Sequence, residues 1–236
     1  MGQTIIDVHR QIGAAHKGAY SHPTHYFLNN YRFFCFMIAL IWMSAGNSYF
    51  SEARIGKLLR FAGERFDTVF VLSPEKPAEH TFRAAGYSEN QVRKRAIHDA
   101  NLLKNRAERQ LAKLENKTHF SFPDWHKVTR HSEYQKCYAE ICELYDTHSQ
   151  FRTDARMTTQ KILLSKFKKL EHIEKAVDEA VLYLLEELAF IFVLPLIYKE
   201  KLVYLYHKPW QVYEQIIQGK YDGKKRENSF LLTGLE

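Results

Sequence analysis

The stretch FFCFMIALIWMSAGNSYFS, residues Phe33–Ser51, decides the fold class that we expect. Its first part, Phe33–Met43, is an unbroken apolar run, which is typical of a strand buried on both faces of a parallel sheet. The run ends in Ser44–Ser48, which are all small or turn-forming residues. A helical pattern over Ser51–Arg65 and a second strand over Thr68–Leu72 follow. This order predicts a βαβ unit, in which ligands bind beyond the carboxyl end of the first strand.

Ser44 stands at that carboxyl end, where a nucleophile or a ligand contact is expected. A turn of small residues at this place can also cradle a phosphate or simply reverse the chain. The nucleotide-binding motifs GxGxxG and GxxxxGK[ST] are absent from the stretch. A serine hydrolase remains an alternative, although the GxSxG elbow is missing because Trp42 occupies the place of its first glycine.

The size and charge of the chain narrow the class of protein further. The chain has 236 residues and is 45% hydrophobic, so we expect one domain over residues 1–236. Lys and Arg outnumber Asp and Glu by 34 to 27, which gives a formal net charge of +7. A basic balance indicates a polyanionic partner such as nucleic acid, or an anionic membrane surface. A non-catalytic tRNA- or RNA-binding module is therefore a second alternative.

The sequence contains no evident signal for secretion, membrane insertion or metal binding. The first residues lack the apolar core of a signal peptide, and the longest apolar run, Phe33–Met43, is too short to span a bilayer. We therefore expect a cytoplasmic protein without a membrane partner, and three free cysteine thiols. His22 and His25 could share a metal, but an exposed loop is the favoured interpretation, so we predict no metal and no cofactor.

A long basic helix is predicted over Ser88–Asn116. Ser88 is a suitable N-cap, and Gln91 three residues later completes a capping box. The faces away from the apolar stripe carry seven Lys or Arg against four acidic residues. Such a charge run is usually a solvated surface, and the alternative is a stripe that follows the phosphates of a nucleic acid.

The rest of the chain alternates between short breaks and further helices. Two prolines in Ser73–Pro77 predict a loop, and Phe120–Trp125 predicts a strand or loop. Helices are expected over Glu133–Thr147 and Phe151–Leu170, the second of which ends in a smaller basic cluster of Lys166, Lys168 and Lys169. The polar tail from Gln218 onward is expected to fray.

Two late segments carry polar groups of interest. A strongly apolar helix over Ile173–Phe192 places Tyr183 and Glu187 on one face, four residues apart. Glu187 would need a partner if it faced inward, and the alternative is that it lies on the wet side of the helix. The alternating segment Leu202–Tyr206 predicts a strand that ends at His207.

Three motifs together resemble the cyclodipeptide synthases, a family that makes cyclic dipeptides from two aminoacyl-tRNAs. They are SAGNSYFS at Ser44–Ser51, the Tyr183-x-x-x-Glu187 pair, and the Tyr206-His207 pair, within a resemblance that spans Ile41–Pro209. Asn47 together with Tyr206 resembles the subfamily that keeps Asn in the serine loop. The resemblance implies a single Rossmann-like α/β domain with a mainly parallel sheet flanked by helices, similar to the catalytic domain of class I aminoacyl-tRNA synthetases.

The resemblance also implies a role for each residue of the site. Ser44 would carry first an aminoacyl group and then a dipeptidyl group, and Tyr206 would relay protons. Tyr183 and Glu187 would hold the substrate α-amino group. Gly46 and Asn47 are candidate oxyanion donors through their backbone N–H groups, and Trp42 and His207 complete the expected substrate site. Neither ATP nor a cofactor is required, because the aminoacyl ester is already activated. We expect a monomer whose tRNA-binding residues are Arg93, Lys94, Lys104, Arg106 and Arg109.

Trp42 bears on the choice of the first amino acid. Relatives commonly have Gly two residues before the catalytic Ser, and side chains alternate along a strand, so Trp42 and Ser44 point to the same side. An indole there would fill space that a Gly leaves for the first aminoacyl side chain. This predicts a small first residue, most simply Ala, and the alternative is that the indole turns away into the core.

Overall fold

The computed structural model describes residues 34–115, 118–167, 170, 172–226 and 228–233. The expected loops or short helix before residue 31, with His22 and His25, lie outside the described residues, as do Lys168 and Lys169.

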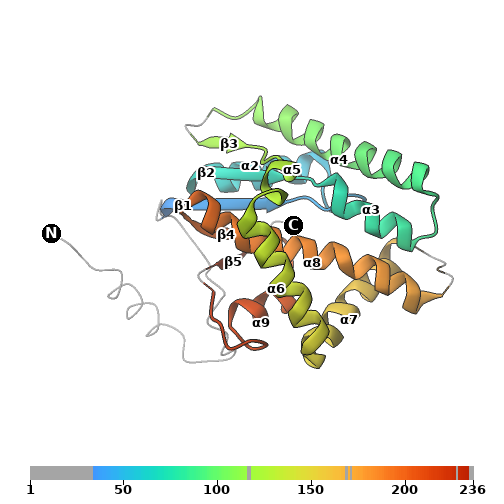
Figure 1. Ribbon diagram of the computed structural model, residues 1–236. Coiled ribbons are helices and arrows are strands. Elements are labelled where there is room, and N and C mark those ends of the chain that lie inside the picture. Colours follow the sequence, from blue (N-terminus) through green and yellow to red (C-terminus); the bar gives the residue numbers. More distant parts are fainter. Residues whose placement is uncertain (1–33, 116–117, 168–169, 171, 227, 234–236) are drawn as a thin grey trace, which may run out of the picture.

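A five-stranded parallel sheet forms the centre of the fold (Figure 1). Its strands lie in the order β3-β2-β1-β4-β5. They span β1 Phe34–Trp42, β2 Phe66–Leu72, β3 His119–Ser121, β4 Lys201–Tyr206 and β5 Ser229–Leu232. The chain first winds outward from β1 through β2 to β3 and then returns to β4 on the other side of β1. The predicted Rossmann-like α/β class is therefore confirmed, and β1 and β4 meet where the strand order reverses.

The central strand is buried on both faces, as its apolar run predicts. Ile38, Leu40 and Trp42 point into one hydrophobic cluster. Ala39 and Ile41 point into the other. All five side chains are at most 2% exposed. Alternation along a strand thus divides one continuous apolar run between two cores.

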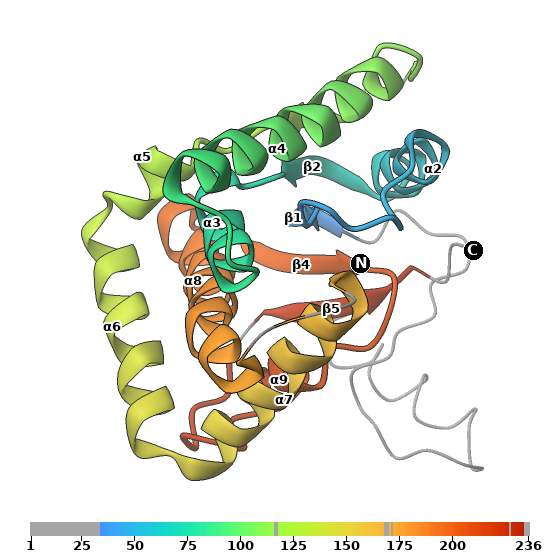
Figure 2. The same cartoon turned by 90° about the vertical axis from the view of Figure 1, so that its right-hand side faces the viewer.

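Helices cover both faces of the sheet (Figure 2). On one face lie α2 and α4, whose apolar residues join those of Ala39 and Ile41. The other face carries α5, α6, α8 and α9 around Trp42. The helices span α2 Glu52–Gly63, α3 Glu75–Ala84, α4 Glu89–Leu111, α5 Trp125–Thr129, α6 Ser132–Thr147, α7 Ser149–Lys166, α8 Ile173–Tyr198 and α9 Gln211–Ile217.

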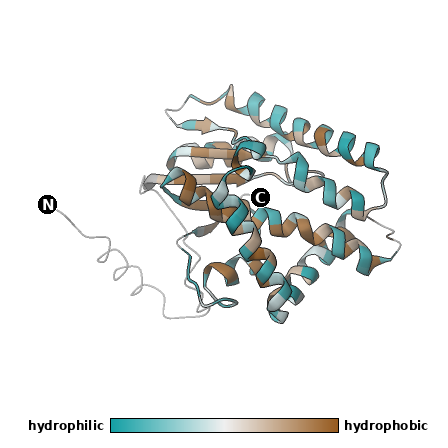
Figure 3. Ribbon diagram, viewed as in Figure 1, coloured by the Kyte–Doolittle hydropathy of each residue, from teal (hydrophilic) through white to brown (hydrophobic). Residues whose placement is uncertain are grey.

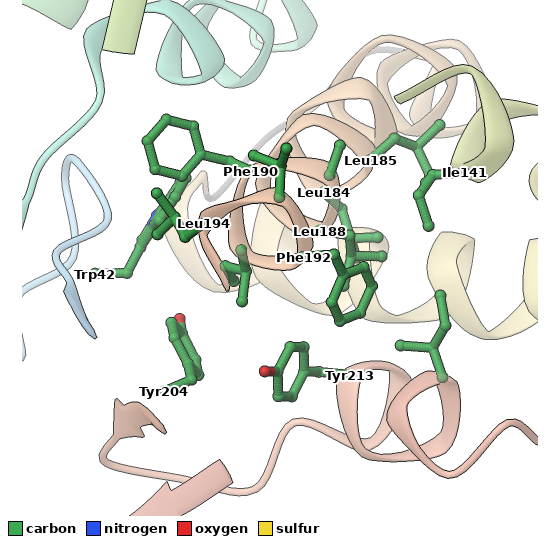
Figure 4. Close-up of a cluster of buried hydrophobic side chains, with 14 of the residues drawn as sticks. Trp42, Ile141, Leu184, Leu185, Leu188, Phe190, Phe192, Leu194, Tyr204 and Tyr213 are labelled. Carbon is green, nitrogen blue, oxygen red and sulfur yellow. The ribbon is translucent and has the colours of Figure 1, made fainter. Parts of the chain in front are cut away.

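Helix α8 is the main apolar element of the second core (Figures 3 and 4). It is long and apolar enough to cross a membrane by length and composition alone. However, 67% of its apolar window is buried inside the fold, against α3, α6, α7 and β4. It also continues six residues beyond the predicted end at Phe192, through Pro195.

The long basic helix is confirmed as α4, with the predicted capping box at its start, but it ends at Leu111, before the predicted end at Asn116. The Ser88 N–H donates to Gln91 Oε1 at 3.1 Å. Helix α4 is largely hydrophilic along its length (Figure 3).

Two expectations about irregular segments are wrong. The predicted loop at Ser73–Pro77 instead begins helix α3, for which Pro74 is the N-cap. Pro77 lies in the first helical turn, where the missing N–H has no helical acceptor to lose. The tail after Gln218 does not fray throughout, because Ser229–Leu232 pairs with β4 as strand β5 and buries Phe230 and Leu231. Four residues in a polar tail are too short a run for periodicity to reveal.

Candidate active site

The expected site residues gather at the carboxyl edge of the sheet, where β1 and β4 end. Ser44 follows β1 after one residue, and Met43 N–H donates to the Leu72 carbonyl at 2.7 Å, which ties this end of β1 to β2. Tyr206 is the last residue of β4. Helix α8 packs beside them and supplies Tyr183 and Glu187.

The Ser44 side chain lies between two tyrosines. It lies close enough to Tyr183 and to Tyr206 to oppose, by side-chain hydrogen bonding, the rise in the pKa of each hydroxyl, and it remains partly exposed. Burial raises the pKa of both tyrosine hydroxyls above their usual value, so both stay protonated at neutral pH. The structure thus brings together three side chains that come from three separate segments of the sequence.

The turn after Ser44 is held by its own backbone. Asn47 N–H donates to the Ser44 carbonyl at 3.2 Å, and Asn47 Oδ1 accepts from Tyr49 N–H at 3.0 Å. Gly46 has φ +69°, a left-handed conformation that favours glycine. Asn47 N–H is therefore already used within the turn, which disfavours its expected role as an oxyanion donor and leaves Gly46 N–H as the candidate.

Glu187 faces inward, and its side chain has a partner that the sequence analysis missed. Glu187 is 7% exposed, and its Oε1 accepts from Tyr204 Oη at 3.2 Å. Burial raises the pKa of Glu187 to about 8, although Tyr204 and the cation of Lys166 act in the opposite direction. Tyr204 precedes Tyr206 by two residues on β4, so the period of a strand was the signal that places both rings on one face.

Trp42 turns into the core (Figure 4). At the same time it contacts the site. Its indole is fully buried and packs edge-on against Trp125 and Phe190, with ring centroids 6.1 and 5.6 Å away. Its Nε1–H donates to Tyr183 Oη at 2.9 Å. The indole thus fills the space directly beside the hydroxyl that contacts Ser44.

Lys166, the last residue of α7, is a second group that the sequence analysis did not place in the site. Its Nζ donates to the Ala45 carbonyl at 2.7 Å, inside the turn that follows Ser44. Burial lowers the pKa of this ammonium to about 8, and the carboxylates of Asp99 and Glu187 oppose the shift. Within the sequence this lysine belongs to a basic cluster, and only the packing of α7 distinguishes it from a surface residue.

His207 is a neutral aromatic packing residue in this structure. Its ring stacks on Tyr49 with centroids 3.6 Å apart and an angle of 11° between the planes. Burial, together with the cations of Lys208 and Arg54, lowers the pKa of His207 to about 4. The ring is therefore uncharged at neutral pH and supports the loop that carries Asn47.

The five basic residues expected to bind tRNA divide into two groups on α4. Arg106 donates to the Phe50 carbonyl at 3.0 Å, and Arg109 pairs with Glu52 at 2.7 Å, so both tie α4 to the start of α2. Lys104 is exposed and lies 3.9 Å from Glu108. Arg93 and Lys94 are exposed, and neither pairs with a carboxylate of the described residues.

A groove of about 540 Å³ lies elsewhere, beside the amino end of β4. Phe192, Pro195, Leu196 and Arg226 are among its lining residues, and it contains none of the site residues. The candidate site is therefore assigned from the grouping of side chains around Ser44.

The fold and the site define a Rossmann-like α/β enzyme with a partly exposed serine just beyond strand β1. The sequence profile of the cyclodipeptide synthase family matches residues 38–232, so the chain belongs to this family. Its members are aminoacyltransferases that depend on aminoacyl-tRNA. This finding sets aside the serine hydrolase and the non-catalytic RNA-binding module.

Individual relatives agree with the family assignment. The cyclo(L-leucyl-L-leucyl) synthase of Staphylococcus haemolyticus is 23% identical over 199 residues, which are 80% of this chain and 82% of the relative. A cyclodipeptide synthase from Bacillus thermoamylovorans superposes with a TM-score of 0.71 at 21% identity, over 82% of this chain and 86% of the other.

Two further solved structures are similar to this chain in fold. The Mycobacterium tuberculosis structure relates cyclodipeptide synthetases to type I tRNA synthetases, and its TM-score is 0.68 at 17% identity, over 83% of this chain and 84% of the other. The cyclodipeptide synthase of Candidatus Glomeribacter gigasporarum is bound to Phe-tRNAPhe, with a TM-score of 0.60 at 14% identity, over 82% and 85% of the two chains.

Proposed function

We propose that the protein makes a cyclic dipeptide from two aminoacyl-tRNAs by way of covalent intermediates on Ser44. The observation that carries the proposal is the position of the Ser44 side chain, which lies beside the Tyr183 and Tyr206 side chains and near the buried Glu187. We further infer that the chain belongs to the subfamily with Asn in the serine loop. Asn47 supports this inference because it holds the turn with both its N–H and its side chain.

In the first step Ser44 Oγ attacks the ester carbonyl of the first aminoacyl-tRNA. A new ester forms on Ser44, the bond to the tRNA ribose oxygen breaks, and the proton of Ser44 goes to that oxygen. One ester replaces another, so the task of the site is orientation and charge stabilisation. Tyr206, which contacts Ser44, is placed to relay the proton.

Glu187 and Tyr183 would hold the α-amino group of the Ser44-bound residue. A buried carboxyl whose pKa is about 8 matches an α-amino group, which titrates near 8. In its ionised form Glu187 can therefore pair with the ammonium and accept its proton, which frees the amine to attack. The amine then attacks the ester of the second aminoacyl-tRNA and releases that tRNA. Finally, the amine of the second residue attacks the Ser44 ester, closes the ring and restores the serine.

The first residue is proposed to be small, most simply Ala. The support is the Trp42 indole, which is fully buried and donates to the Tyr183 hydroxyl at 2.9 Å. A side chain attached to an α-carbon held by Tyr183 would meet this indole. The second amino acid is left open by this geometry.

The tRNA is proposed to dock on α4. Arg93, Lys94 and Lys104 are exposed there, whereas Arg106 and Arg109 already have partners within the fold. The tRNA-bound relative supports the same substrate class. Independence from ATP, a monomeric state and a cytoplasmic location stay predictions.

Mass spectrometry of medium from cells that produce the protein tests the proposed function. The expected result is a cyclic dipeptide that is absent from cells producing Ser44→Ala. Purified wild-type protein incubated with labelled aminoacyl-tRNA should also carry label on the peptide that contains Ser44. The proposal fails if the medium contains no cyclic dipeptide while the purified protein is folded and binds aminoacyl-tRNA.

A further inference from the structure

The side chain of Lys166 presents an unusual arrangement at the turn after Ser44. Its Nζ donates to the Ala45 carbonyl at 2.7 Å. A Cβ atom placed on Gly46 would lie 3.9 Å from this Nζ and 3.5 Å from Asp99 Oδ2. The ammonium of α7 and a carboxylate of α4 therefore both lie close to the turn that follows Ser44.

An ammonium in this place is costly. Burial lowers the pKa of Lys166 to about 8, because a charge that is removed from water is disfavoured. A hydroxyl or amide would satisfy the Ala45 carbonyl without burying a charge. The cation is therefore expected to act on the Ser44 turn beyond filling one hydrogen bond.

The peptide geometry indicates what this action is. The Ala45 carbonyl and the Gly46 N–H belong to one planar peptide unit, and no peptide bond of the described residues is cis. A donor that fixes the carbonyl oxygen also fixes the direction of the N–H on the opposite side of the unit. A charged donor additionally polarises the amide and strengthens its N–H as a hydrogen-bond donor.

Asn47 N–H, the other expected oxyanion donor, is not available for this role. Asn47 N–H donates to the Ser44 carbonyl at 3.2 Å, so the turn itself consumes it. Of the two expected oxyanion donors, Gly46 N–H therefore remains, and its peptide unit is the one that Lys166 holds.

We propose that Lys166 is a positioning residue that orients and polarises the Ala45–Gly46 peptide, so that Gly46 N–H donates to the oxyanion formed at Ser44. The inference rests on the proposed acylation of Ser44. When Ser44 Oγ bonds to the carbonyl carbon, the carbonyl electron pair moves to oxygen, and Gly46 N–H stabilises that charge. The pair returns as the bond to the ribose oxygen breaks. Lys166 neither gives nor takes a proton.

The test compares Lys166→Met with Lys161→Met, an exposed lysine on the same helix. The readout is the single-turnover rate at which labelled aminoacyl-tRNA acylates Ser44, together with the Kd for the tRNA. Removing an oxyanion donor outright slows a reaction by roughly 10²–10³-fold. Lys166→Met should lose only the orientation of Gly46 N–H, so its acylation rate should fall less, by about ten- to a hundredfold, with unchanged tRNA affinity. Lys161→Met should acylate at the wild-type rate.

A second variant separates charge from structure. Lys166→Arg keeps a cation at every accessible pH and should acylate within about threefold of wild type at pH 7. Above pH 8 the wild-type rate should fall relative to the Arg variant, because Lys166 loses its charge there. The other groups that face this ammonium or titrate beside it are Asp99, Tyr183, Glu187, Tyr206 and Lys208. They are common to both proteins, so the ratio of the two rates isolates Lys166.

The outcomes distinguish this inference from the proposed function. Acylation by Lys166→Met at the wild-type rate overturns the role of Lys166 and leaves the covalent mechanism intact. Parallel pH profiles for wild type and Lys166→Arg overturn it as well, even if the Met variant does not fold. Absence of label on Ser44 in the wild-type protein instead refutes the proposed function.

Discussion

Replacing Trp42 by Ala should widen the choice of the first amino acid at a measurable cost in stability. The indole is fully buried among Trp125 and Phe190, and truncation of such a residue costs about 3–5 kcal/mol. The usual free energy of unfolding of a domain, about 5–15 kcal/mol, equals or exceeds this loss. The space that opens adjoins Tyr183, so each methylene newly admitted there should favour the larger residue by about tenfold or more.

The assay follows acylation of Ser44 by single aminoacyl-tRNAs, because the identity of a cyclic product does not reveal which residue came first. Wild type should accept Ala-tRNA and discriminate against Leu-tRNA and Phe-tRNA, and Trp42→Ala should accept the larger residues. Trp125→Ala is the matched control, since its indole belongs to the same cluster but does not bond with Tyr183. Urea unfolding should show a comparable loss of stability in both variants, with altered selection only at Trp42. Rapid acylation of the wild-type enzyme by Phe-tRNA would refute the reasoning.

Three other changes test the remaining parts of the site. Ser44→Ala should fold normally and form neither product nor labelled enzyme, and label that persists would contradict the covalent assignment. The double variant Arg93→Ala and Lys94→Ala should bind tRNA with a weaker salt dependence. The slope of log affinity against log salt concentration should fall by about 0.9 for each phosphate of a duplex arm that is no longer neutralised. An unchanged slope would place the tRNA elsewhere. Glu187 binds a proton more tightly in the folded protein than in the unfolded chain, so its contribution to stability falls as pH rises from about 4.5 to about 8. In urea unfolding, Glu187→Gln should therefore gain stability relative to wild type as the pH rises through this window. The gain should be about 1.4 kcal/mol for each unit by which the pKa of Glu187 in the folded protein exceeds that in the unfolded chain. Stability curves of the two proteins that run parallel with pH would disprove the raised pKa.

The central strand and the serine turn could be predicted from the sequence because their signals are local. An apolar run that ends in small residues sufficiently defines a buried strand and the turn after it. The helix that carries Tyr183 and Glu187 was also predicted, but its periodicity left two interpretations of Glu187. The structure selects the inward orientation because Tyr204 supplies a partner from a strand that lies next to β1 in the sheet.

The parts that sequence analysis missed depend on contacts between distant segments. Lys166 resembles any surface lysine in a basic cluster, and it enters the site only because α7 packs against α8 and ends at the Ser44 turn. Likewise, β5 is too short to recognise alone and exists because β4 offers it an open edge. Arg106 and Arg109 match a phosphate-binding stripe by composition, yet the packing of α4 over α2 gives them partners within the chain.

The protonation states around Ser44 restrict how its proton can leave. His207 has a pKa of about 4 and stacks on Tyr49, so it is a poor general base for the serine at neutral pH. Tyr183 and Tyr206 contact Ser44, but burial raises the pKa of each, so neither holds a stable negative charge. A tyrosine hydroxyl can nevertheless accept one proton while it donates another, which requires no ionised intermediate. The proton of Ser44 is therefore expected to pass through a tyrosine hydroxyl to the departing ribose oxygen in one concerted transfer, and the protonation states of Glu187 and Lys166 need not change during that step.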